Sequence, residues 1–94
     1  AEVVQVFKAL SVESRVQIVK LLRERQVCVN ALTHQLEISQ PAVSQHLSVL
    51  KKAGLVTSER YGSIVHYSLD REKLEDFKQS VKKVLGSEFI ILED

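Results

Sequence analysis

The spacing of apolar residues changes at Gly54, and this change limits the possible fold more than any other feature of the sequence. Before Gly54, apolar residues recur at steps of three and four, as Val43, Leu47 and Leu50 do, which is the pattern of one helix face. After it, apolar and polar residues alternate as far as Leu69, which is the pattern of a strand. The sequence therefore predicts a mainly α-helical protein that also contains a small β element.

The helix before Gly54 has clear signals at both ends. Ser39 is a good N-cap, and Pro41 falls in the first turn, where its missing N–H removes no helical hydrogen bond. Gly54 suits the left-handed position just past a helix end. Asn30 is a candidate N-cap for a preceding helix that ends near residues 37–38. We therefore expect two helices joined by a tight turn, a helix-turn-helix over about residues 30–53.

The alternating segment predicts a β-hairpin. Residues 64–69 form one expected strand, residues 56–60 form its antiparallel mate, and Tyr61-Gly62-Ser63 is the turn between them. A helix-turn-helix followed by such a hairpin, a wing over about residues 56–69, is the layout of a winged helix-turn-helix. In that layout the second helix of the pair enters the major groove of DNA.

Three further helices are expected, and the outer two lack a partner. Residues 14–24 carry an apolar arc wide enough for a central helix. A short helix near the start has one apolar stripe, and an amphipathic helix over about residues 71–85 has another. The apolar residues of these two stripes are Val3, Val4, Phe7 and Leu10, and Leu74, Phe77, Val81, Val84 and Leu85.

Length and composition narrow the class of protein. Ninety-four residues, 45% hydrophobic and 27% charged, are typical of one globular domain, so we treat residues 1–94 as a single domain. The longest apolar run, residues 89–92, is far shorter than the roughly 20 residues of a membrane span. The lone Cys28 cannot form an intrachain disulfide, and no signal segment is evident, so we expect a cytoplasmic protein without membrane contact. The role of the apolar and acidic residues 87–94 is open.

The polar face of the helix before Gly54 favours contact with DNA. The formal net charge is only +1, but residues 39–69 hold three basic residues against one acid. Glutamine can form paired hydrogen bonds to an adenine edge, serine reaches bases or phosphates, and lysine suits phosphates. An ordinary solvated helix face is the alternative, but it is more often rich in glutamate. The DNA-binding candidates on this helix are Ser39, Gln40, Pro41, Ser44, Gln45, Ser48, Lys51 and Lys52.

Three segments together resemble the ArsR/SmtB family of winged-helix transcriptional repressors. They are VFKALSVESRVQIVKLL, SQPAVSQHLSVLKKAGLV and GSIVHYSLD, and the resemblance covers about residues 5–85. The second is the most specific, because the family's recognition helix opens with Ser-Gln and continues through Ser-x-His-Leu to Leu-x-x-x-Gly-Leu-Val. One departure is Val12, where many members have an aspartate.

The resemblance implies a homodimer built from the first and last helices, which agrees with the two stripes that lack a partner. A symmetric dimer predicts a palindromic operator in double-stranded DNA, with half-sites about one helical turn apart. In the wing, Arg60, Tyr61 and Ser63 flank the recognition helix, and Arg60 is expected at a phosphate or in the minor groove. The expected dimer-interface residues are Val3, Val4, Phe7, Leu74, Phe77, Val81 and Val84.

The family's usual metal sites are incomplete in this sequence. Cys28 matches the first residue of a Cys-x-Cys pair, but Asn30 stands in place of the second. A second family site on the last helix keeps Asp70 but has Lys73 and Lys83 where histidines are typical. We therefore expect no bound metal and no cofactor, and the effector is unknown.

The remaining titratable residues leave alternatives open. Cys28 is expected to be a buried structural residue, with a redox- or electrophile-responsive sensor as the alternative. His34 and Glu37 have a chelating spacing but are too few for zinc, while His46 and His66 are expected to pack or to face DNA. No nucleophile motif or phosphate loop indicates an enzyme. A winged-helix module that binds protein rather than specific DNA remains a second alternative.

Overall fold

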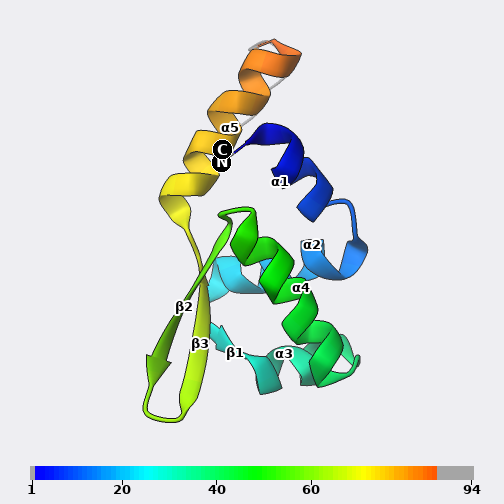
Figure 1. Ribbon diagram of the computed structural model, residues 1–94, viewed down its shortest axis with the longest axis vertical. Coiled ribbons are helices and arrows are strands. Elements are labelled where there is room, and N and C mark those ends of the chain that lie inside the picture. Colours follow the sequence, from blue (N-terminus) through cyan, green and yellow to red (C-terminus); the bar gives the residue numbers. More distant parts are fainter. Residues whose placement is uncertain (1, 87–94) are drawn as a thin grey trace.

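A computed structural model describes residues 2–86 as five helices and a small antiparallel sheet (Figure 1). It confirms the mainly helical winged helix-turn-helix fold. The elements in chain order are α1 (Val3–Ala9), α2 (Glu13–Glu24), β1 (Val27–Cys28), α3 (Val29–Leu36), α4 (Gln40–Lys52), β2 (Val56–Tyr61), β3 (Ile64–Leu69) and α5 (Arg71–Leu85).

Helices α3 and α4 form the helix-turn-helix. Helix α3 begins at Val29 with Cys28 in the N-cap position, two residues earlier than an Asn30 cap predicts. It ends at Glu37, whose φ of 57° makes it the single non-glycine residue with positive φ among residues 2–86. This left-handed residue turns the chain sharply into Ser39, the N-cap of α4, as expected.

The expected two-stranded wing is confirmed as β2 and β3, and a third strand, β1, joins it to give a sheet in the order β1-β3-β2. The hairpin of β2 and β3 pairs Val56 with Leu69 and turns at Gly62, whose φ of 65° favours glycine. The additional strand β1 pairs Cys28 with His66. The sequence did not predict β1, because two residues are too few to show a period-two pattern. The strand forms because Val27 is buried against the core beside β3.

One hydrophobic core joins α1, α2, α3 and α4 to the base of the wing. Its centre is formed by side chains with 0 to 1% exposure from all four helices. In Figure 1, α4 crosses in front of α2, and the long β2–β3 hairpin extends from one side. The largest fully buried side chains are Val6, Ile18, Leu22, Leu32, Val43, Leu47, Leu50 and Leu55.

Helices α1 and α5 lie side by side at one end of the molecule (Figure 1). The rings of Phe7 and Phe77 meet edge to face with centroids 5.4 Å apart. Nevertheless, α5 contains no fully buried residue, and Phe7 is 44% exposed. The pair of helices therefore presents apolar surface outward. None of the described helices is long and apolar enough to cross a membrane.

Candidate nucleic-acid interface

Helix α4 is held by its apolar side and presents its polar side to solvent. The Oγ of Ser39 accepts a hydrogen bond of 3.3 Å from the backbone N–H of Ala42, which caps the helix. Val43, Leu47 and Leu50 are buried beneath it. The α4 residues proposed from the sequence to contact DNA are all exposed: Gln40, Pro41, Ser44, Gln45, Ser48, Lys51 and Lys52.

The end of α4 is joined to the wing by a contact that the sequence did not predict. Lys51 Nζ donates a 2.7 Å hydrogen bond to the Oγ of Ser58 on β2. Because a lysine ammonium has three donors, Lys51 keeps capacity for a phosphate while it makes this bond. No sequence pattern marks Ser58, because its pairing depends on how the hairpin folds back toward α4.

The tip of the wing carries the other proposed contacts. Arg60, Tyr61 and Ser63 are all exposed on either side of the hairpin turn. The hydroxyl of Tyr61 donates a 3.2 Å hydrogen bond to Glu59 Oε1, and its ring meets that of His66 edge to face at 5.1 Å. The aromatic ring is thus oriented from two sides, while the Arg60 side chain extends into solvent.

His46 lies on α4 at the border between the core and the exposed face. Burial lowers its pKa below the usual value, and the nearby positive charge of Arg15 on α2 lowers it further. The imidazole is therefore kept neutral at neutral pH. His46 contributes packing at this border and adds no charge to the exposed face of α4.

Among residues 2–86, no three histidine, cysteine, aspartate or glutamate residues gather in a group that could hold a metal ion. Cys28 is half-buried rather than fully buried, and its partner in the sheet register is His66. His34 and Glu37 are both exposed at the end of α3. Asp70 caps α5, where its Oδ1 accepts a 3.1 Å hydrogen bond from the backbone N–H of Lys73. The expectation that the family metal sites are incomplete remains a prediction.

The expected dimer residues lie on α1 and α5, some exposed and some packed between the helices or against the core. Val4 and Val84 are 50% and 59% exposed, and Phe7 and Phe77 contact each other between the two helices. Val3, Leu74, Phe77 and Val81 are half-buried. Leu85, 49% exposed, extends this apolar face beyond the residues expected to form the interface.

The exposed face of a capped second helix, flanked by a hairpin, defines a winged helix-turn-helix DNA-binding domain. Residues 13–58 match the model of the family described as bacterial regulatory protein, arsR family. The chain is 39% identical to the uncharacterized HTH-type transcriptional regulator YbzH of Bacillus subtilis, over 81% of this chain and 94% of the relative.

Two further comparisons agree with this match. The chain is 49% identical to the transcriptional repressor SmtB of Mycobacterium tuberculosis over 69% of its own length, and it spans about half (48%) of that relative. It also resembles the solution structure of the homodimeric winged helix-turn-helix DNA-binding domain Mb0332 from Mycobacterium bovis, with a TM-score of 0.74 and 29% identity over 93% of this chain and 81% of that one. The chain belongs to the ArsR family of bacterial DNA-binding transcriptional regulators. The members of this family are regulators and not enzymes.

Proposed function

We propose that the protein is a homodimeric repressor that binds a palindromic operator by inserting α4 into the major groove of each half-site. The observation that carries this proposal is the exposed face of α4, which combines glutamine, serine and lysine and contains no acid. Short side chains allow the helix backbone to approach the bases closely. Gln40 and Gln45 then read base edges, and the lysines contact phosphates.

The wing supplies contacts on the flank of the same half-site. Arg60 is placed at a phosphate or in the adjacent minor groove, with Tyr61 and Ser63 beside it. The hydrogen bond between Lys51 and Ser58 supports joint docking, because it joins the end of α4 to strand β2 of the wing. Ser39 contributes mainly as the helix cap, and Pro41 allows the first turn of α4 to lie close to the DNA backbone.

A second copy of the chain is the partner that best fits α1 and α5. Both helices keep large apolar side chains half-exposed, among them Phe7, Val84 and Leu85. The M. bovis neighbour of similar fold is homodimeric. Two-fold pairing through α1 and α5 places two copies of α4 on one side of the DNA, which requires half-sites about one helical turn apart.

Selection from a random duplex library tests the proposal. We expect enrichment of one sequence with two inverted half-sites and an affinity that falls steeply as salt rises. Salt-dependent binding without enrichment of any sequence would show that the protein associates with DNA non-specifically, and would contradict the proposed operator. The absence of DNA binding at low salt would favour a winged-helix module that contacts protein instead.

A further inference from the structure

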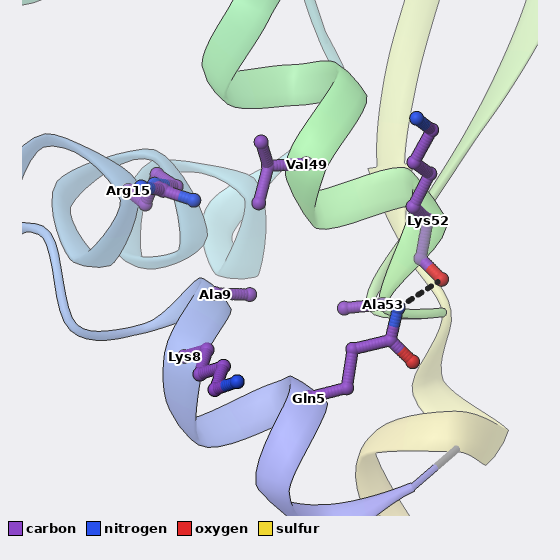
Figure 2. A pocket seen from close by; sticks show the side chains of 7 residues that line it. All are labelled: Gln5, Lys8, Ala9, Arg15, Val49, Lys52 and Ala53. Carbon is purple, nitrogen blue, oxygen red and sulfur yellow. Dashed lines mark hydrogen bonds between the residues drawn. The ribbon is translucent and has the colours of Figure 1, made fainter.

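A cavity of about 320 Å³ lies between α1, α2 and α4, beside the face of α4 proposed to meet DNA. It is partly open to solvent, and its volume lies at the lower end of the range of about 300 to 1,000 Å³ that is usual for small-molecule sites. Figure 2 shows its lining side chains, which come from all three helices. They are Gln5, Lys8, Ala9, Arg15, Val49, Lys52 and Ala53.

Three basic residues and no acidic residue line the cavity, and the ammonium of Lys52 points away from it (Figure 2). In Figure 2, Lys8 on α1 and Arg15 on α2 point toward α4, while the side chain of Lys52 extends away from Ala53 at the rim. Within residues 2–86 the one ion pair joins Lys78 to Glu75 on α5, so no described carboxylate pairs with these three cations. Positive charges gathered without an acid favour an anionic occupant.

Arg15 is the least exposed of the three basic residues, because it is half-buried while Lys8 and Lys52 are exposed. A half-buried guanidinium is less screened by water than an exposed ammonium, so it attracts an anion more strongly. The charge of Arg15 also reaches His46, where it contributes to the lowered pKa of that imidazole.

The rest of the lining is apolar. Ala9, Val49 and Ala53 line the space between the helices. Inorganic phosphate alone leaves such a surface uncovered. A carboxylate or phosphate group attached to a compact apolar body matches both parts of the lining.

We propose that this cavity binds a small organic anion, held by Arg15 and Lys8, and that its occupancy weakens DNA binding. The regulatory half of this proposal rests on the proposed function, whereas the binding half does not. The Nε2 of Gln5 donates a 3.5 Å hydrogen bond to the backbone oxygen of Lys52, so α1 is already joined to the end of α4 at the edge of the cavity.

The binding half is tested by NMR titration of the whole chain without DNA. The probes are benzoate, inorganic phosphate and the neutral isostere benzamide. We expect saturable benzoate shifts centred on the amides of Lys8, Arg15 and Val49, with weaker binding of phosphate and none of benzamide. Absence of saturable binding of both anions, or binding of benzamide as tight as that of benzoate, would overturn the proposal.

Charge-neutral variants assign the site. Losing one charge-assisted contact should weaken benzoate binding about tenfold in Arg15→Gln and by a smaller factor in the exposed Lys8→Gln. Arg23→Gln removes an exposed charge from the same helix outside the cavity, and this matched control should bind as the unaltered protein does. Equal affinity in all three variants would contradict the assignment, and Lys8→Gln keeps the test valid if Arg15→Gln does not fold.

The regulatory half is tested with DNA. Saturating benzoate should lower the affinity of the unaltered protein for DNA about tenfold, within the usual range of coupling between sites, and should have little effect on Arg15→Gln. Benzoate binding without any change in DNA affinity would overturn the regulatory half alone. The salt slope is the slope of the logarithm of DNA affinity against the logarithm of salt concentration. If Arg15→Gln instead weakens DNA binding in the absence of any anion and lowers the magnitude of this slope by about 1, the cavity receives a DNA phosphate and the proposal fails.

Discussion

The side-chain nitrogen of Lys51, at the end of α4, lies 2.7 Å from the hydroxyl oxygen of Ser58 on β2. This hydrogen bond joins the helix proposed to read bases to the hairpin proposed to flank them. Because the pair is exposed, it adds less than about 1 kcal/mol to the free energy of unfolding. The bond adds a contact between α4 and the wing, whose position depends mainly on the pairing of β1 with β3 and on the burial of Val56 and Leu69 at its base.

Substitutions at Lys51 and at Ser58 distinguish the effect of the lysine charge on DNA affinity from the effect of the hydrogen bond between the two residues. We predict that Lys51→Ala lowers affinity for all DNA sequences alike and lowers the salt slope by about 1, whereas Ser58→Ala has a smaller effect and leaves the slope unchanged. Ser58→Thr, which keeps the hydroxyl, should restore the affinity. Fluorescence anisotropy at several salt concentrations measures both quantities, and a slope lowered equally by Ser58→Ala would contradict the assigned roles.

Gln45 is predicted to carry sequence specificity. Gln45→Ala should cost about 1 to 3 kcal/mol of binding free energy on the selected operator and little on random DNA, because the paired hydrogen bonds to a base edge are lost. Competition between the two duplexes measures the difference. An equal loss on both would show that Gln45 contacts the backbone.

The sequence predicted the recognition helix well and the surroundings of the wing less well. Ser39, Pro41 and Gly54 mark the ends of α4 by local chemistry, so the helix could be placed within a residue or two. Strand β1 and the Lys51–Ser58 bond depend on segments that meet only after folding, and no local pattern encodes them. The cavity at Arg15 was missed for the same reason, because its lining comes from three separate helices.

Val84 tests whether the apolar face of α1 and α5 is an interface. The side chain is 59% exposed, so Val84→Glu should leave the fold of one chain intact while placing a charge in the proposed contact. We expect sedimentation to change from dimer to monomer with an unchanged circular dichroism spectrum. Gln26→Glu adds the same charge at an exposed position outside α1 and α5 and should remain dimeric. A dimeric Val84→Glu protein would place the interface elsewhere.

Gly62 tests the turn of the wing. A Cβ at this position meets no atom within 4 Å, but the φ of 65° is unfavourable for a side chain. Gly62→Ala should therefore lower the free energy of unfolding by about 1 kcal/mol through backbone strain alone, and Gly62→Asn should cost less because asparagine tolerates this conformation. Urea unfolding at fixed protein concentration measures both. Equal costs for alanine and asparagine would indicate a cause other than φ.

His46 predicts a specific dependence of stability on pH. Its pKa in the folded protein lies below the ordinary value of 6.5, so the unfolded chain binds the proton more tightly. The stability contributed by the neutral imidazole is complete above pH 6.5 and is lost as the pH falls through 6.5 toward the folded pKa. In His46→Gln, the difference in unfolding free energy between pH 7.5 and pH 5.5 should be smaller than in the unaltered protein. An unchanged difference would show that other groups dominate.

The spacing of half-sites tests the central claim most directly, because a rigid dimer presents two copies of α4 to one side of the duplex. Affinity is measured for the selected operator and for a version with about five base pairs, half a helical turn, inserted between its half-sites. The account predicts that the insertion abolishes high-affinity binding and leaves only the weak, salt-sensitive association that any duplex shows. Unchanged affinity for the lengthened operator would contradict the symmetric dimer and its mode of reading DNA.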